Sequence, residues 1–458
     1  MSKHENKKRS SFSGKLGFVL SAAGASVGLG NIWRFPYLAA KYGGGIFLLI
    51  YIILALTFGY SMIVAETSIG RMTGKSPVGA FHSFGKAKWL SFGGWINAII
   101  PILIVPYYSV IGGWVIKYLF EYVIGHAGTV AADGYFSSFI SSGAATEICF
   151  LIFVFITLAI IFAGVRNGIE RVSKFMMPIL VVLSVVIAVY SVSRPGAMAG
   201  VKYFLIPNVE NFSWMTVVSA MGQMFYSLSI AMGILITFGS YMKKDVSIEG
   251  STKNVEIFDT AIAIMAGLMI IPAVFAFSGG DPDTLQAGPA LMFITIPKVF
   301  ANMGFGTVVG ILFFLLVLFA AVTSSIALTE SAVSTFEDEI GWSRRKSTVV
   351  IGIIMIALGT LSCLGYGPLA FVKIIGMQFL DFFDFLTNSV MMPIAAMMTS
   401  IFVSKVVGID RIEEEIRHGE AAFRRKKIFV VMIKYLCPIF AMIILASSVA
   451  NAFGWISM

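Results

Sequence analysis

Residues 21–36 read Ser-Ala-Ala-Gly-Ala-Ser-Val-Gly-Leu-Gly-Asn-Ile-Trp-Arg-Phe-Pro and lie within the first long apolar run of the chain. Three glycines, Gly24, Gly28 and Gly30, fall near the middle of this run and are followed by the polar Asn31. Glycine weakens a helix, and a buried amide needs a hydrogen-bonding partner. The stretch therefore predicts a membrane helix interrupted near its centre. Taken alone, it also fits close helix packing through small residues spaced four apart.

A second interruption occurs at residues 222–233, which read Gly-Gln-Met-Phe-Tyr-Ser-Leu-Ser-Ile-Ala-Met-Gly. Gln223, Ser227 and Ser229 occupy the middle of an apolar run there. An unwound membrane helix exposes carbonyls and amides that lipid cannot satisfy, so such a segment must face protein or a cavity. Paired interruptions in two corresponding helices indicate a transport site at the membrane midplane. The pair favours this interpretation over simple packing.

The composition identifies a polytopic membrane protein. Of the 458 residues 58% are hydrophobic and only 12% are charged, whereas soluble domains carry about 25% charged residues. A helix of ~20 apolar residues crosses the hydrocarbon layer, and such runs follow one another along the chain. We predict an all-α fold with 11 transmembrane helices at 15–39, 45–70, 90–122, 147–165, 171–190, 213–242, 255–278, 305–336, 347–364, 370–403 and 428–454.

The spacing of the two interruptions, in helices 1 and 6, predicts two five-helix inverted repeats. Two external connections are long, at 123–146 and 279–304, and the second is expected to form a lid of short helices. The expected division of the chain is a cytoplasmic tail at 1–14, a transport core at 15–403 (repeats 15–190 and 213–403), a basic cytoplasmic loop at 404–427, and helix 11 with a short external end at 428–458.

The distribution of basic residues predicts the orientation. Most of the 33 lysines and arginines fall in segments that this helix order places on one side of the membrane. Cytoplasmic loops carry such an excess. We therefore expect a multi-pass protein of the bacterial inner membrane with a cytoplasmic N-terminus and an external C-terminus.

Several other classes of function are not expected. The net charge of +9 comes from short loops between apolar runs, so it indicates topology and no nucleic-acid partner. Cys149, Cys363 and Cys437 lie far apart within apolar segments, without metal-ligand spacing, and are interpreted as packing residues. No paired nucleophile and base lie at a plausible site, so an enzyme is not expected. Whether the chain is a monomer or a homodimer stays open.

Residues 25–36 resemble the helix-1 signature of the neurotransmitter:sodium symporter family, and are similar to its bacterial members such as the leucine transporter and multi-substrate hydrophobic amino-acid transporters. Other stretches resemble the family in the same order, over nearly the whole chain. These are Tyr107-Tyr108, residues 225–233, and residues 320–325 ahead of 336–339.

The resemblance implies sodium-coupled symport of neutral, hydrophobic or aromatic L-amino acids by alternating access, with two sodium ions. Two alternatives are weighed against it. A proton-coupled or exchanging carrier of the same fold should lack the Thr323-Ser324 pair, which is present. A non-transporting amino-acid receptor would carry a cytoplasmic signalling domain or a long tail.

The resemblance also implies the binding residues. It places the substrate on Ser26, Leu29, Gly30, Ile104, Tyr108, Tyr226, Ser227, Ser229, Met232, Ser324 and Leu328. It places the first sodium ion on Ser26, Asn31, Ser227 and Asp259, and the second on Gly24, Val27, Ala320, Thr323 and Ser324.

Asp259 departs from the asparagine usual in the family at the first sodium site. Some relatives need chloride to balance charge there, and a built-in carboxylate could replace it, so chloride independence is the hypothesis. The alternative is that Asp259 merely caps the cytoplasmic end of its helix. Ala231 replaces the family's usual glycine, so the preferred substrate size stays open.

The same resemblance implies gates on either side of the site. Arg34, Asp384 and Gln223 are expected to close the external side, and Arg9 and Asp338 the cytoplasmic side. Glu66 lies deep in an apolar helix, where a carboxylate is expected to be functional. It is predicted to hold the unwound part of helix 1.

Overall fold

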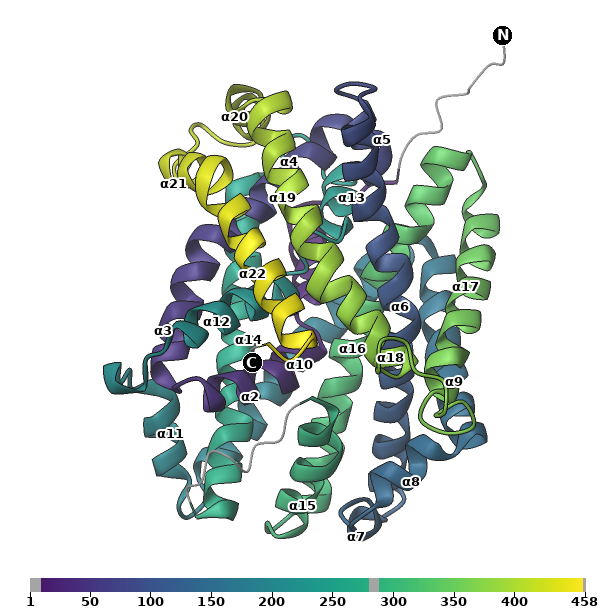
Figure 1. Ribbon diagram of the computed structural model, residues 1–458, viewed down its shortest axis with the longest axis vertical. Coiled ribbons are helices and arrows are strands. Elements are labelled where there is room, and N and C mark those ends of the chain that lie inside the picture. The colour runs from purple at the N-terminus through teal and green to yellow at the C-terminus, as the bar shows by residue number, and fades with distance from the viewer. Residues whose placement is uncertain (1–9, 280–287, 456–458) are drawn as a thin grey trace.

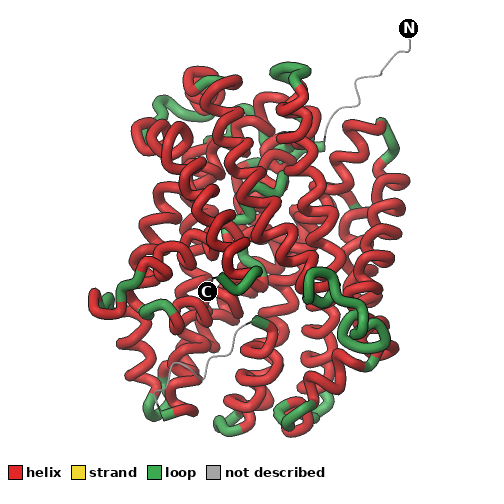
Figure 2. Tube along the Cα trace, viewed as in Figure 1, coloured by secondary structure: helices red, strands yellow, loops and turns green. Residues whose placement is uncertain are grey.

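The structure is a computed structural model that describes residues 10–279 and 288–455 (Figures 1 and 2). Every named element within these ranges is a helix, and the tube in Figure 2 contains no strand there. The all-α membrane fold predicted from composition is therefore confirmed.

Nine helices of the described ranges are long and apolar enough to cross a membrane. In chain order they are Gly45–Thr73 (α3, Gly45–Leu54, through α4, Tyr60–Thr73), Lys88–Val123 (α6), Gly143–Phe162 (α9), Val165–Val192 (ending in α10, Arg171–Val192), Ile248–Ser278 (α14), Gly306–Ile340 (α16), Arg344–Leu364 (α17), Phe379–Val407 (α18, Phe379–Asp384, through α19, Met392–Phe402) and Lys426–Ala452 (α21, Lys426–Val431, through α22, Cys437–Ala452).

The first apolar run forms a bent pair of helices. α1 (Lys15–Ser26) ends where the backbone of Val27 turns extended, with ψ of 93°. The chain resumes as a wide π-helical turn, η1 (Gly30–Arg34), and continues into α2 (Phe35–Lys41). The two halves are inclined by 54° and together form a tenth span. The interruption lies at the glycine-rich stretch that predicts it.

The second interruption is longer. The predicted helix 213–242 consists of α12 (Trp214–Ser227) and α13 (Ile234–Ser240), each too short to cross a membrane alone. Between them Ser229 and Ala231 adopt φ of 52° and 59°. Non-glycine residues rarely occupy this left-handed region, so surrounding contacts must hold it in place.

The remaining short helices gather at the two ends of the bundle (Figure 1). α5 (Pro77–His82) and α20 (Ile409–Arg417) lie at the same end of the bundle as α21, which is the end predicted to be cytoplasmic; α20 lies within the predicted basic loop. The opposite end carries α7 (Ala127–Val130), α8 (Tyr135–Ser141), α11 (Ala197–Leu205) and α15 (Ile296–Ala301).

The last predicted core helix begins later than expected. Residues 370–378 are not part of it, and α18 starts at Phe379. Gly365, Gly367 and Pro368 interrupt the preceding region, and Gly376 adopts a positive φ of 78°. These residues end one helix and delay the next although the segment is apolar.

Small residues bring the second half of the broken helix 6 against α4. A methyl group placed on Gly70 would lie 1.9 Å from the Ile236 carbonyl oxygen, and one on Gly239 would lie 2.4 Å from the Thr67 carbonyl oxygen. Both glycines thus allow two backbones to touch. This contact fixes the position of α13 beneath the break.

We predict that Gly70→Ala destabilises the folded protein by about 3 kcal/mol, because the added methyl group must displace backbone rather than a flexible side chain. The measurement is the melting temperature of the detergent-purified protein. Gly128→Ala is the control, since a methyl group there meets nothing within 4 Å. Equal melting temperatures for the two variants would contradict the close contact.

Candidate functional site

Side chains from helix 1 itself and from other helices satisfy backbone groups released by the break in helix 1. The Leu29 amide donates to the Tyr108 hydroxyl at 3.3 Å, and the Gly28 amide donates to Asn31 Oδ1 at 3.2 Å. Gln223 Nε2 donates to the Gly30 carbonyl at 3.0 Å. Gln223 was predicted to belong to the external gate, but its side chain contacts the backbone of helix 1 directly after the break.

The break in helix 6 is held in the same way. The Ser229 hydroxyl donates to the Ala25 carbonyl at 2.9 Å, so the two breaks bind each other directly. The Ala231 amide donates to Glu66 Oε1 at 2.7 Å. Glu66 therefore holds the unwound part of helix 6, whereas the sequence predicted helix 1. The glycine contacts described above pack α13, which follows this break, directly against α4.

A small cavity of about 30 Å³ lies between the two breaks. Its walls carry no Asp, Glu, Lys, Arg or His. Ten of the eleven residues predicted to bind substrate line it, and Ser227 lies outside. The lining residues are Ala25, Ser26, Gly28, Leu29, Gly30, Asn31, Ile104, Tyr108, Tyr226, Ser229, Met232, Ser324 and Leu328.

A fully enclosed polar cluster lies beside this cavity. The Asp259 carboxylate accepts hydrogen bonds from Asn31 Nδ2 at 2.8 Å and from the Ser227 hydroxyl at 2.9 Å. Tyr51 donates to the other Asp259 oxygen at 2.8 Å and lies 3.0 Å from Ser227 Oγ. Asp259 is thus deeply buried in a shell of three polar residues and does not serve as a helix cap.

Tyr51 is the member of this cluster that sequence reasoning missed. Its side chain has no exposed surface. The only signal is one hydroxyl-bearing aromatic residue in the run 45–54. From the sequence alone, such a tyrosine is equally well interpreted as a packing residue or as an interfacial residue.

The residues predicted to form the second sodium site meet where α1 packs on α16. The Ser324 hydroxyl lies 3.3 Å from the Gly24 carbonyl oxygen and 3.4 Å from that of Val27. The Thr323 hydroxyl lies 3.1 Å from the Ala320 carbonyl oxygen. All the polar groups here are neutral oxygen atoms, the ligand type that hard cations prefer.

A larger cavity of about 540 Å³ lies on the external side of the breaks and is lined by Arg34 and Asp384, two of the three residues predicted to form the external gate. The Arg34 guanidinium lies 5.5 Å from the centre of the Tyr226 ring. Asp384 accepts from Asn388 Nδ2 at 2.6 Å and from the Tyr107 hydroxyl at 3.2 Å. Among the described residues no ion pair joins Arg34 to Asp384.

Of the two residues predicted to form the cytoplasmic gate, one lies within the described residues. Arg9 lies outside the described residues, and Asp338 accepts from the Ser76 amide at 2.6 Å. A second ionic contact nearby was not predicted. Arg344 pairs with the buried Glu330, at 2.5 Å and 3.0 Å, and the Tyr241 hydroxyl donates to the same carboxylate at 2.7 Å. The sequence feature that could have indicated this ion pair is Glu330, the one glutamate within the apolar run 305–336.

Two facing helix breaks around a small cavity, inside a helical membrane bundle, are the features of a secondary transporter. Comparison with known proteins identifies the family. The chain belongs to the Sodium:neurotransmitter symporter family, whose model matches residues 9–127 and 135–454. Its class of function is sodium-coupled membrane transport, and it is not an enzyme.

Individual relatives of the chain are named as sodium-dependent transporters. The chain is 34% identical to the uncharacterized sodium-dependent transporter YhdH of Bacillus subtilis, over 89% of this chain and 90% of that protein. It is 31% identical to an uncharacterized sodium-dependent transporter of Haemophilus influenzae, over 97% of this chain and 99% of that protein. Among solved structures, MhsT in complex with L-phenylalanine matches with a TM-score of 0.86 and 34% identity, covering 96% of this chain and all of MhsT.

The contact between Glu66 and the helix-6 break generates a prediction. Glu66→Ala leaves the buried Ala231 amide without an acceptor, which should destabilise the protein by about 1–3 kcal/mol. Glu66→Gln keeps a carbonyl acceptor and should retain most of that stability. Melting temperatures of the three purified proteins measure the difference. If alanine and glutamine behaved alike, the hydrogen bond would not be what holds the break.

Proposed function

We propose that the protein imports neutral, hydrophobic or aromatic L-amino acids together with two sodium ions. The observation that carries the proposal is the neutral cavity between the breaks, with backbone groups of both breaks at its edge. An acidic or basic substrate side chain would be left there without a partner, at high cost. MhsT, which binds L-phenylalanine in its solved structure, is a relative with a compatible ligand.

In this proposal the amino-acid backbone of the substrate binds to the breaks. The carboxylate is bound by the amides of Leu29 and Gly30 and by the hydroxyl of Tyr108. The close approach of Tyr108 to Leu29 supports this assignment, because both groups can then reach one carboxylate. The ammonium group is bound by carbonyl oxygens of Ser26, Tyr226 and Ser229.

The substrate side chain then lies against Ile104, Met232 and Leu328, which are apolar and line the cavity. Methionine is unbranched and adapts to irregular shapes. A pocket of this kind suits large aliphatic and aromatic side chains better than small ones.

The two ions differ in how their charge is balanced. The first ion would bind Ser26, Asn31, Ser227, Asp259 and the substrate carboxylate, so that a built-in negative charge lies beside it. The second would bind only neutral oxygen atoms of α1 and α16. Few charged ligands suit a monovalent ion that must also be released.

Two sodium ions would provide enough energy for steep accumulation. Moving two charges through 100 mV yields ~4.6 kcal/mol. A tenfold sodium gradient adds about 1.4 kcal/mol per ion. The sum of about 7 kcal/mol corresponds to roughly 10⁵-fold accumulation, and a single ion would give half that free energy.

Transport would proceed by alternating access around this fixed site. Arg34 and Asp384 are separate in the structure, and we propose that they pair above the substrate once the external cavity closes. The inner contacts of Asp338, and the ion pair between Glu330 and Arg344, would then have to loosen for release to the cytoplasm.

The function is tested by uptake of labelled leucine, tryptophan, tyrosine and alanine into proteoliposomes, with and without an inward sodium gradient. We expect accumulation of the large substrates that requires sodium. Uptake indifferent to sodium would contradict symport and indicate exchange or proton coupling. Sodium-dependent binding without uptake would indicate a receptor instead.

The buried position of Asp259 predicts the response to chloride. Replacing chloride by gluconate should leave uptake by the wild-type protein unchanged within about twofold. Asp259→Asn removes a buried charge and should cost about 2 kcal/mol, or roughly 30-fold in apparent sodium affinity. Part of that loss should be recovered by chloride but not by gluconate. Asp410→Asn, at an exposed position, is the control, and a strong chloride requirement in the wild type would contradict the assignment.

A further inference from the structure

A second cavity of about 260 Å³, which we call the basic pocket, lies at the end of the molecule predicted to be cytoplasmic. It is formed by α4, by the start of α14 and by the segment that precedes α21. The residues used below are Tyr60, Glu249, Lys253, Glu420, Arg424 and Arg425, all of which line it. None of them takes part in the site between the breaks.

The two carboxylates of the basic pocket are occupied by the protein itself. Glu249 accepts from the Tyr60 hydroxyl at 2.5 Å and from the amides of Arg425 and Arg424 at 3.0 Å and 2.8 Å. Glu420 accepts from the Glu249 amide at 2.6 Å. These acids therefore fix the loop onto α4 and α14.

The cations are less fully paired. Arg425 lies 3.3 Å from Glu256 and stacks at 4.5 Å over the Tyr60 ring. The side chains of Lys253 and Arg424 are exposed, and no ion pair to them occurs within the described ranges. Lys15 of α1 approaches the same place, since its Nζ would lie 3.1 Å from a methyl group on Gly250.

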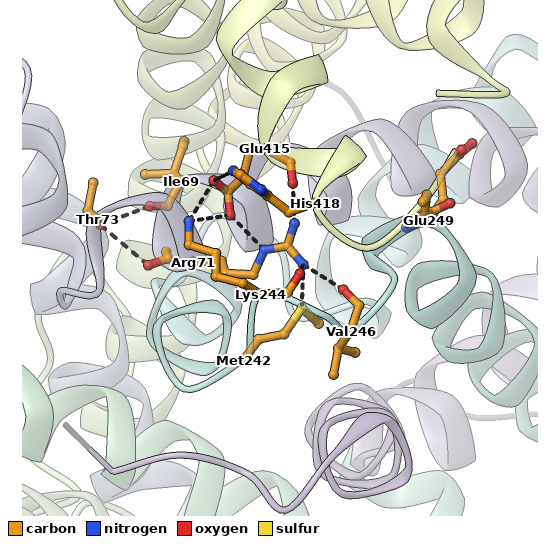
Figure 3. A network of polar contacts seen from close by, with 11 residues as sticks. Ile69, Arg71, Thr73, Met242, Lys244, Val246, Glu249, Glu415 and His418 are labelled. Atoms are coloured by element: carbon orange, nitrogen blue, oxygen red, sulfur yellow. Dashed lines mark hydrogen bonds and ion pairs between the residues drawn. The ribbon is translucent and has the colours of Figure 1, made fainter. Parts of the chain in front are cut away.

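A neighbouring network holds the loop in position (Figure 3). Arg71 at the end of α4 pairs with Glu415 of α20 at 2.7 Å and donates to the Val246 carbonyl at 2.5 Å. Lys244 pairs with the same glutamate at 2.7 Å. The side chains of Arg71 and Glu415 are nearly inaccessible, so α20 is firmly attached. The backbone that carries Arg424 and Arg425 is thus fixed from both sides.

The depth of the basic pocket matches the boundary of the bilayer. Lys253 and Glu249 lie six and ten residues from Asp259 along α14. At 1.5 Å per residue this is about 9 and 15 Å. Half the hydrocarbon thickness is about 15 Å. If the helix breaks lie near the midplane, the pocket lies at the level of the phospholipid headgroups.

Exposed apolar side chains continue the pocket toward the membrane interior. Leu56, Ile257 and Ile428 are each more than a third exposed. They lie four residues from Tyr60, Lys253 and Arg424 in the sequence. Ile257 lies about one turn from Lys253 within α14, so these two residues are on the same helix face. Leu56 precedes Tyr60 in the helix that continues into α4, and Ile428 lies in α21 just after the turn that carries Arg424. A ligand with an anionic head and long apolar chains would contact both the basic pocket and these apolar side chains. A soluble anion would contact the basic pocket alone.

We propose that the basic pocket binds the phosphate headgroup of an anionic phospholipid of the same leaflet, with its acyl chains over Leu56, Ile257 and Ile428. Lys253, Arg424 and Lys15 would provide the positive charge, and Arg425 and Tyr60 the wall of the pocket. Basic pockets between membrane helices on the cytoplasmic side bind such headgroups.

The test is native mass spectrometry of the full-length protein in detergent, titrated with phosphatidylglycerol. The wild type should retain one phosphatidylglycerol in preference to phosphatidylcholine. Lys253→Gln combined with Arg424→Gln should weaken retention by about 25-fold, or roughly fivefold per charge. Arg345→Gln combined with Lys427→Gln removes the same two residue types from exposed positions outside the pocket, and should change retention less than twofold.

Three results would overturn the proposal. An equal loss in both double variants would mean diffuse surface attraction. Displacement of phosphatidylglycerol by millimolar inorganic phosphate would mean a soluble-anion site. Equal retention of phosphatidylcholine would remove the role of charge. Should the double variant fail to fold, Lys253→Gln alone removes an exposed side chain and should still weaken retention about fivefold.

Discussion

The whole structure depends on one constraint, which is that broken backbone inside a membrane must find its hydrogen bonds within the protein. The breaks at residues 27–29 and 228–233 release amides and carbonyls at the same level of the bundle. They bind each other through Ser229 and Ala25. Other released groups form hydrogen bonds with Tyr108, Gln223 and Glu66 from surrounding helices. What is left at the centre is a neutral cavity edged by backbone.

The same constraint explains why charge is so unevenly placed. Two carboxylates without exposed surface are surrounded by donors: Asp259 has Asn31, Ser227 and Tyr51, and Glu330 has Arg344 and Tyr241. Such groups are costly in a low-dielectric interior unless they are paired. Asp259 lies beside the cavity and Glu330 lies toward the predicted cytoplasmic end, so the two buried charges occupy separate parts of the bundle.

Much of this could be predicted because it has a local signature. Glycines followed by Asn31 predict a break, and apolar runs predict helices. The contacts of Tyr51 and Glu66 could not be predicted, because their partners lie 208 and 165 residues away and nothing local to either residue specifies them. The late start of α18 was missed for another reason, since an apolar composition outweighed the glycines that interrupt it.

The proposed transport depends on sodium binding at the helix breaks. Equilibrium binding of radioactive sodium to the purified protein, at saturating substrate, tests it most directly. We expect two ions per chain, falling to one in Asn31→Ala, which affects the first proposed site, and to one in Thr323→Ala, which affects the second. Absence of bound sodium in the wild type, or two ions in both variants, would contradict it.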